Sequence, residues 1–172
     1  VNGGPGGPVM DLLAGKIGMM DTRLLGESRD DAGNEGIGRY GKLKEPRPLG
    51  CLAADILVAL GIAFARLVGD PEKRVEEVAI CTGSAASLIP NAMGVGAQAL
   101  VGGDFGYHAA RDAEAAGLGL IDIGHFGSEH FMVEVLAGRL NALMAKEGFS
   151  AKASTCPLEK DPFILLQGAM NP

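Results

Sequence analysis

The sequence contains few of the residues that mark a disulfide-rich protein. It has 172 residues with no tryptophan and only three cysteines, Cys51, Cys81 and Cys156, which lie far apart without C-x-x-C spacing. Neither a disulfide framework nor a cysteine zinc site is therefore expected, and unpaired cysteines favour a reducing, cytoplasmic compartment.

Long apolar runs and dense positive charge are also absent. No apolar stretch reaches the roughly 20 residues that span a bilayer, since the segment from Leu49 to Val68 is interrupted by Asp55, Gly61 and Arg66. The net charge is −6 and no Lys/Arg cluster occurs. We expect neither membrane insertion nor direct nucleic-acid binding.

The residues that are present predict two regions. Residues 1–48 read as an irregular, glycine-rich lead-in with short elements, namely a short helix through Val9 and Leu13 and a strand or sheet edge over 36–43. The first eight residues lack the charged and apolar regions of a signal peptide and resemble an internal start. Residues 49–172 read as an α/β domain that carries the candidate site.

The second region alternates apolar runs with amphipathic ones. A long helix is expected over 49–67, and the following strands and helices are expected in the order strand 75–81, helix 85–93, strand 99–101, helix 107–116, strand 118–123 and helix 129–147. Short links between such elements predict an α/β fold with a largely parallel or mixed sheet flanked by helices. Sites in such sheets lie at the carboxyl ends of strands.

The first predicted strand end holds Cys81 and the turn Thr82-Gly83-Ser84. Backbone N–H groups in this turn could face an anion, but it lacks both glycine-rich nucleotide motifs, so a plain turn with Ser84 as helix N-cap is the favoured interpretation. Cys81 is expected to be a small buried thiol, since the sequence places no base beside it.

The third strand end, Gly124-His125-Phe126-Gly127-Ser128-Glu129, is the most informative stretch. If Ser128 opens a helix, His125 and Glu129 lie about one turn apart and can converge on one metal ion. Imidazole with carboxylate suits zinc, manganese or iron. The alternative is that His125 caps the strand while Glu129 complements the positive end of the helix.

The second strand end offers a proton-transfer pair. Asp104 and His108 are four residues apart, and a carboxylate beside an imidazole raises the histidine pKa toward neutral pH or above. The alternative is that Asp104 is an N-cap and His108 packs on the sheet. His130 directly follows Glu129 and is expected to point elsewhere.

Four segments together resemble the Nif-three-like dinuclear-metal family, whose members are often labelled GTP cyclohydrolase 1 type 2 homologues. They are 38–43, 78–84, 103–113 and 124–129, in the family's order. The resemblance implies an α/β fold of two related halves, two divalent metal ions per subunit and a homo-oligomer, typically a hexameric ring. It assigns C-terminal metal ligands to His125 and Glu129.

The same resemblance implies that the chain is the C-terminal portion of a longer protein. The family's other ligands, a His-His pair and an aspartate before a glycine-rich turn like Asn2–Gly7, have no counterpart here. Two ligands per chain should bind metal weakly or not at all, because removing ligands weakens metal binding.

Three functional hypotheses follow. The full-length protein is a metal-dependent hydrolase or cyclohydrolase for a nucleotide-like small molecule, with Asp104 and His108 assisting proton transfer or orienting substrate. Alternatively, it is a metal-binding adaptor or chaperone with a protein partner and no catalysis. Third, this chain is an inactive fragment whose exposed apolar face promotes self-association.

Overall fold

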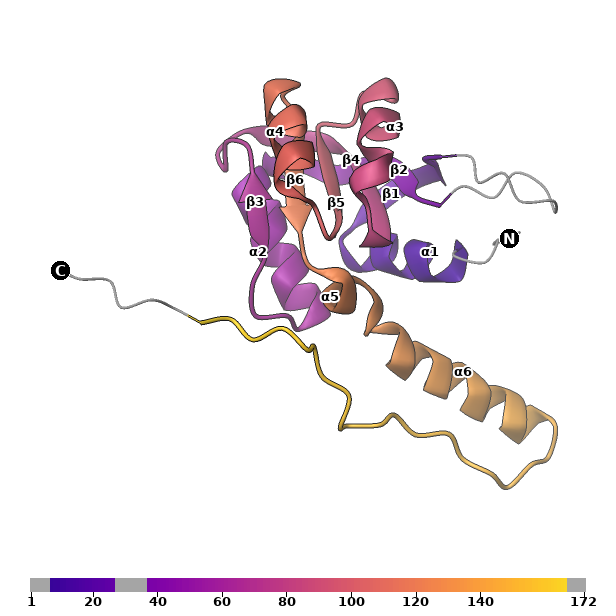
Figure 1. Ribbon diagram of the computed structural model, residues 1–172. Helices are drawn as coiled ribbons and strands as arrows, with labels where there is room; N and C mark the ends of the chain where they lie inside the picture. Colours follow the sequence, from indigo (N-terminus) through magenta and orange to yellow (C-terminus); the bar gives the residue numbers. More distant parts are fainter. Residues whose placement is uncertain (1–6, 27–36, 167–172) are drawn as a thin grey trace. The chain divides into compact units, whose positions relative to one another are not determined.

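The computed structural model describes residues 7–26 and 37–166 (Figure 1), which form two compact units divided after Phe131. The predicted glycine-rich start at residues 1–6 and the first residue of the predicted 36–43 strand lie outside the described residues. Each unit is described by itself.

The first unit is built on a six-stranded mixed sheet. Its strands are β1 (Met19–Leu24), β2 (Arg39–Pro48), β3 (Arg66–Val68), β4 (Arg74–Ser84), β5 (Ala99–Gly103) and β6 (Gly119–Asp122). They lie in the order β1-β2-β4-β5-β6-β3. The central strands β4, β5 and β6 are parallel, whereas the pairs β1/β2, β2/β4 and β3/β6 are antiparallel. The predicted α/β class with a parallel or mixed sheet is confirmed.

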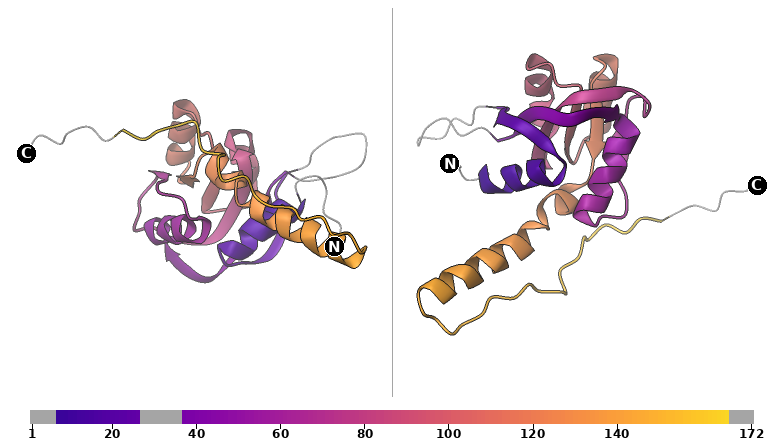
Figure 2. Two further views of the ribbon diagram at one scale, coloured as in Figure 1. Left: turned by 90° about the horizontal axis from the view of Figure 1, so that it is seen from below. Right: turned by 180° about the vertical axis from the view of Figure 1, so that it is seen from behind.

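Helices cover both faces of this sheet. The helices are α1 (Gly7–Lys16), α2 (Leu49–Leu60), α3 (Ile89–Gly94), which follows the short 3-10 turn η1 (Ala86–Leu88), α4 (Tyr107–Ala115) and α5 (His125–Glu129). Two views show α1 and α2 on one side of the sheet and α3 and α4 on the other (Figure 2). The unit therefore has three layers with two cores.

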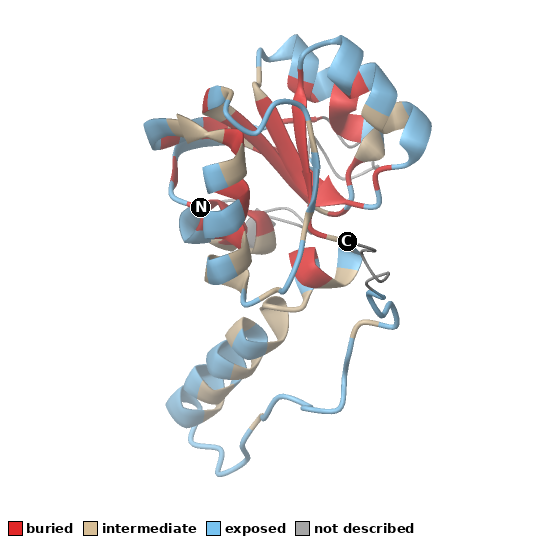
Figure 3. Ribbon diagram, turned by 90° about the vertical axis from the view of Figure 1, so that its left-hand side faces the viewer, coloured by how far each residue is buried: buried red, intermediate tan, exposed pale blue. Residues whose placement is uncertain are grey.

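Alternation along the central strands explains the two cores. In β4, Val78 and Ile80 join the core under α1 and α2, whereas Ala79 and Cys81 join the core under α3 and α4. Successive side chains of a strand point to opposite faces, so a strand covered on both sides is apolar throughout. The three parallel strands are accordingly buried along most of their length (Figure 3).

The structure differs from the expected division at residue 48. Strands β1 and β2 belong to the same sheet as β4 to β6, so residues 19–48 are part of the α/β unit. Strand β1 escaped prediction because only its first residue, Met19, is buried, which removes the apolar alternation from the strand.

Two predicted helices are interrupted in the structure. The helix expected over 49–67 ends at Leu60, where Gly61 adopts φ 67° in the left-handed region that glycine tolerates, and β3 follows. The helix expected over 129–147 is split, with α5 ending at Glu129 and α6 (Met132–Lys146) starting the second unit. Apolar spacing continued across both breaks, so periodicity alone did not reveal them.

The second unit consists of α6 and the residues after it. None of the side chains of α6 is buried. Asn141 in this helix holds Ala153 through two hydrogen bonds of 2.8 Å, one in each direction. Across 7–26 and 37–166, no helix combines the length and apolar character that crossing a membrane requires.

Candidate metal centre

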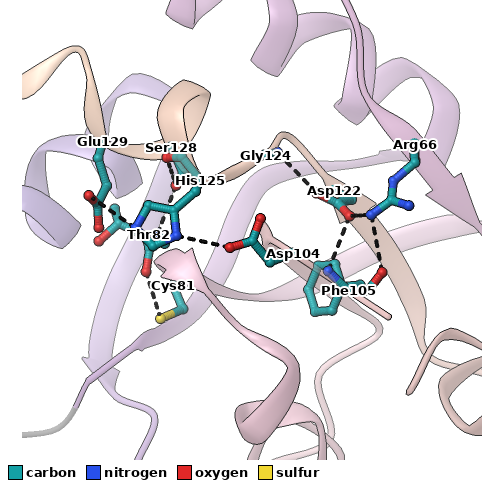
Figure 4. A network of polar contacts seen from close by, with 11 residues as sticks. Arg66, Cys81, Thr82, Asp104, Phe105, Asp122, Gly124, His125, Ser128 and Glu129 are labelled. Carbon is teal, nitrogen blue, oxygen red and sulfur yellow. Dashed lines mark hydrogen bonds and ion pairs between the residues drawn. The ribbon is translucent and has the colours of Figure 1, made fainter. Parts of the chain in front are cut away.

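Three turns meet at the carboxyl ends of the parallel strands. Strand register pairs Ser84 of β4 with Gly103 of β5, and Gly102 of β5 with Asp122 of β6. The turns after these strands therefore lie at the same edge of the sheet (Figure 4). The predicted site residues Asp104, His125 and Glu129 are all found here.

Backbone geometry puts His125 at the start of a helix. Gly124 has φ 70° and is the N-cap of α5, so the helix opens at His125 rather than at Ser128 as expected. Ser128 instead links two turns: its hydroxyl accepts a 2.7 Å hydrogen bond from the Gly83 N–H and donates a 2.8 Å bond to the His125 carbonyl. His125 and Glu129 thus share one face of a single helical turn.

The predicted metal pair converges in the structure. The distance from His125 Nε2 to Glu129 Oε2 is 3.5 Å, and both side chains are about half exposed, at 56% and 49%. Gly83 lies against both: a Cβ at this position would be 2.9 Å from Glu129 Oε1 and 3.2 Å from His125 Nε2. A glycine at this point leaves space at the two donor atoms, which any larger residue would fill.

Asp104 pairs with His125 and not with His108. Its Oδ2 lies 2.9 Å from His125 Nδ1, whereas His108 is an exposed residue of α4 in edge contact with Tyr107. The hydrogen bond that His125 Nδ1–H donates to Asp104, together with the charges of Glu129 and Asp104, raises the pKa of His125, and partial burial opposes this. Sequence spacing could not show this partner because it is 21 residues away.

This contact distinguishes the two nitrogens of the His125 ring. When the imidazole is neutral, an Nδ1–H that donates to Asp104 leaves the Nε2 lone pair facing Glu129. Carboxylates that hold the far nitrogen of a ligating histidine in this way fix its tautomer and raise its basicity.

The segment Thr82-Gly83-Ser84, which forms the end of β4, differs from both interpretations of the sequence. The Gly83 N–H is already bonded to the Ser128 hydroxyl, so it does not point at an anion. The helical segment after it has Ala85 at its N-cap position and no side-chain cap hydrogen bond, so Ser84 does not cap it. The contribution of this segment to the site is Gly83, whose lack of a side chain leaves space beside His125 and Glu129.

Cys81 lies beneath the site as expected for a buried thiol. Burial, with a smaller effect from the charge of Glu129, raises the pKa of Cys81 to about 11. All three cysteines are free. At neutral pH Cys81 is therefore protonated and a poor nucleophile.

Sequence reasoning missed Asp122 and Arg66. Asp122 ends β6 with 6% exposure and accepts hydrogen bonds from the backbone N–H groups of Phe105 and Gly124, while Arg66 of β3 forms an ion pair with it. A lone carboxylate inside the apolar run 118–123 was the available signal, because a buried charge requires a partner.

His125 and Glu129 can supply two of the ligands of a metal site, but not a complete set. Among residues 7–26 and 37–166, no group of three or more His, Cys, Asp and Glu side chains could hold an ion together. Asp104 and Glu129 contact opposite nitrogens of the His125 ring, which prevents them from sharing one ion. Further ligands would have to come from outside this set.

The comparisons with known proteins agree with this fold. The chain is 31% identical over 160 residues to the "GTP cyclohydrolase 1 type 2 homolog" of Streptomyces coelicolor, covering 90% of this chain and 56% of the relative. It is 31% identical over 132 residues to the protein of the same name from Bacillus subtilis, covering 77% and 35%. The chain thus spans about a third to just over half the length of these relatives.

A solved structure and a family model complete the comparison. The crystal structure of a Bacillus cereus protein related to NIF3 superposes with a TM-score of 0.82 at 20% identity, covering 92% of this chain and 69% of that one, which shows a shared fold. The model of the Duf34/NIF3 (NGG1p interacting factor 3) family matches residues 5–162. The chain therefore belongs to the Duf34/NIF3 family.

Proposed function

We propose that this chain supplies His125 and Glu129 as ligands of a divalent metal ion in a metal-dependent hydrolase or cyclohydrolase. The observation that carries the proposal is the convergence of His125 Nε2 and Glu129 Oε2 at 3.5 Å, with Gly83 leaving space beside both atoms. Zinc, manganese and iron suit this pair of donors. Two ions per subunit are proposed for the full-length protein, whose other part would provide the remaining ligands.

The chemistry of such a site is hydrolytic. A bound divalent ion would supply Lewis acidity and a water of lowered pKa. Asp104 holds the His125 ring in place through Nδ1, so its proposed role is to orient the ligand. His108, exposed at the start of α4, is proposed to transfer protons to or from substrate.

A nucleotide-like small molecule is the proposed substrate class. The support is the name of the relatives, "GTP cyclohydrolase 1 type 2 homolog", which describes those proteins. Free cysteines support the proposed cytoplasmic setting. In metal-replete full-length protein we expect product from a guanine nucleotide and none after His125→Ala; no product from any nucleotide in a broad panel would contradict the enzymatic proposal.

Elemental analysis tests the metal proposal separately from turnover. Full-length protein purified without chelator or nickel resin should contain metal, and both His125→Ala and Glu129→Gln should lower the metal content per chain. His130→Ala is the matched control, since the His130 ring stacks on Phe126, with ring centroids 4.4 Å apart. Equal metal content in all four proteins would contradict the proposed ligands.

Assembly into a homo-oligomer is proposed for this protein whether it acts as an enzyme or as a metal-binding adaptor or chaperone, and one observation favours it. Helix α6 exposes Leu136, Leu140 and Leu143, which recur at helical spacing. We propose that a second copy of the chain covers this face within a homo-oligomer, a hexameric ring in the full-length protein. Sedimentation analysis should show dissociation after Leu140→Glu, and an unchanged oligomer would contradict this interface.

A further inference from the structure

The carboxylate of Asp122 lies under the two turns that carry Asp104 and His125. It has 6% exposure and uses both oxygens: Oδ1 accepts a 3.0 Å hydrogen bond from the Gly124 N–H, and Oδ2 accepts a 3.2 Å bond from the Phe105 N–H. Gly124 directly precedes His125, and Phe105 directly follows Asp104. One buried side chain therefore bonds to the backbone next to each member of the Asp104–His125 pair.

Arg66 completes this arrangement from the edge strand β3. Its guanidinium pairs with Asp122 Oδ2 and also donates a 3.1 Å hydrogen bond to the Phe105 carbonyl. The Phe105 residue is thus held at its N–H by Asp122 and at its carbonyl by Arg66 (Figure 4). Since a buried carboxylate is costly without a partner, Arg66 also offsets the charge of Asp122.

The held backbone is strained and closely packed. Asp104 has φ 59°, in the left-handed region that residues with a side chain rarely adopt. A Cβ on Gly103 would lie 2.7 Å from the His125 nitrogen, so the two turns are in direct backbone contact. Conformations of this kind persist only where the surrounding structure over-determines them, and Asp122 provides that constraint on both turns.

We propose that Asp122, assisted by Arg66, is a positioning residue that sets the Asp104–His125 hydrogen bond and thereby presents His125 Nε2 to the metal. The metal part of this inference rests on the proposed function. The positioning part concerns only contacts between residues of this chain. The two parts therefore have separate measurements.

Asp122→Asn is the informative substitution because it preserves shape. An amide has a single acceptor oxygen, so whichever way it turns, the N–H of either Phe105 or Gly124 loses its acceptor. Arg66→Ala is the second variant, because this side chain is 67% exposed and its removal is easier to tolerate. It leaves the Asp122 hydrogen bonds but removes the guanidinium bond to the Phe105 carbonyl.

The first measurement is the tautomer of neutral His125, read from nitrogen NMR of the metal-free chain in alkaline buffer. The chain with Asp122 intact should show mainly the Nδ1–H form, and Asp104→Ala should abolish that preference. We expect Asp122→Asn to give a mixture of tautomers and Arg66→Ala a smaller shift in the same direction. An unchanged tautomer in Asp122→Asn, beside a changed one in Asp104→Ala, would overturn the positioning role.

Two controls separate positioning from general stability. Asp55→Asn breaks another Arg–Asp pair, with Arg47, that does not touch the site turns. Leu52→Ala destabilises the core under α2 through a fully buried side chain. Both should retain the Nδ1–H tautomer. A shift in Leu52→Ala as large as that in Asp122→Asn would show that the tautomer follows stability alone, which would also overturn the proposal.

Zinc titration of the same samples tests the metal part. Zinc should perturb the His125 ring nitrogens, and its affinity should fall by about 10- to 100-fold in Asp122→Asn, which is the usual effect of removing an outer partner of a metal ligand. Zinc binding that is unaffected by Asp122→Asn contradicts the inference but preserves the proposed function. Absence of any zinc effect, in both this chain and the full-length protein, contradicts the proposed function while the tautomer still decides the positioning role.

Discussion

The two compact units use similar helices in opposite ways. Helix α2 buries Leu49, Leu52 and Ile56 against the sheet, whereas α6 buries none of its side chains and exposes leucines at comparable spacing. Apolar helical spacing therefore indicates a face capable of burial, not a face that is buried. The first unit is stabilised by its cores, whereas α6 has no buried side chain, and a helix of this length without a buried face is only weakly stable.

Leucine-to-alanine substitutions should show this difference most strongly. Leu52→Ala in α2 is expected to lower the free energy of unfolding by about 2 to 5 kcal/mol, because it leaves a cavity in a closed core. At protein concentrations low enough to keep the chain monomeric, Leu140→Ala in α6 should change it by less than about 0.5 kcal/mol, as for most surface substitutions. Urea denaturation followed by circular dichroism measures both.

The Leu140 result also tests whether the comparison holds in solution. Denaturation is repeated over a range of protein concentrations, with Leu143→Ala as a second exposed leucine. A Leu140→Ala loss comparable to that of Leu52→Ala even at the lowest protein concentration would break the comparison, since it would show that the single chain itself buries this face. A loss that appears only as the protein concentration rises is the result expected from the proposed oligomer.

Glycine substitutions sharpen the same comparison. A Cβ on Gly103 would lie 2.6 Å from the Gly124 carbonyl carbon, so Gly103→Ala forces apart the turns of β5 and β6 and should cost about 1 to 3 kcal/mol. A Cβ on Gly138 in α6 meets nothing within 4 Å. Gly138→Ala should stabilise that helix by up to about 1 kcal/mol through helix propensity.

Thermal melting and helical signal distinguish these glycine variants. Gly103→Ala should lower the melting temperature of the first unit, and Gly138→Ala should raise helical content without changing that temperature. A neutral Gly103→Ala would mean that the two turns can separate at little cost, which would also weaken the role given to Asp122.

The parallel part of the fold could be predicted because its sequence signal is local. The runs that form β4, β5 and β6 are apolar on both faces, and the helices between them are amphipathic, so each element carries its own signal. β1 and β3 are edge strands with mostly exposed residues. Their positions depend on pairing with β2 and β6, and sequence spacing does not record such pairing.

The candidate site also has contacts that local sequence spacing predicts and contacts that it does not. The approach of Glu129 to His125 could be predicted, since both lie on one helical turn. The partner of Asp104 could not, because strand register brings His125 beside it while helical spacing pointed to His108. Asp122 was missed because its two acceptor roles depend on backbone N–H groups, which every residue except proline has.

A smaller effect is expected from the side-chain hydrogen bonds of the second unit. Asn141→Ala removes both bonds to Ala153, so the Ala153 amide should exchange faster, by an amount corresponding to about 0.5 to 1.5 kcal/mol of local protection. Asn141→Asp retains the acceptor and loses the donor, so its Ala153 exchange rate should lie between those of the unsubstituted chain and of Asn141→Ala. The melting temperature of the first unit should not change.

Hydrogen exchange followed by NMR reports these local openings. Strand amides such as that of Leu100 in β5, a fully buried residue, are the internal reference, because we expect them to exchange only when the whole first unit unfolds. If the Ala153 amide of the unsubstituted chain already exchanges as fast as in an unfolded chain, Asn141 does not hold the segment after α6 in solution, and the prediction is wrong.

The smallest expected effect is on how the free energy of unfolding varies with pH near neutrality. The histidine contribution to it comes from the first unit, since all three histidines precede residue 132. The pKa of His125 is raised above 6.5 in the folded state, chiefly by its hydrogen bond with Asp104. Protonated His125 therefore stabilises the fold. This contribution is fully present below pH 6.5 and is lost as the pH rises through the folded-state pKa.

Asp104→Asn should remove most of that contribution. Both side chains are about half exposed, so solvent screening limits the loss to a few tenths of a kcal/mol, on the order expected for surface ion pairs. The difference in unfolding free energy between this variant and the unsubstituted chain, measured in urea with chelator present, should be largest below pH 6.5 and shrink in alkaline buffer. Asp112→Asn, on the exposed part of α4, is the matched control and should give a difference that does not vary with pH. The opposite result would be a difference in unfolding free energy between Asp104→Asn and the unsubstituted chain that grows toward alkaline pH. It would contradict the expectation and would mean that Asp104 stabilises the fold through neutral His125 or through another partner.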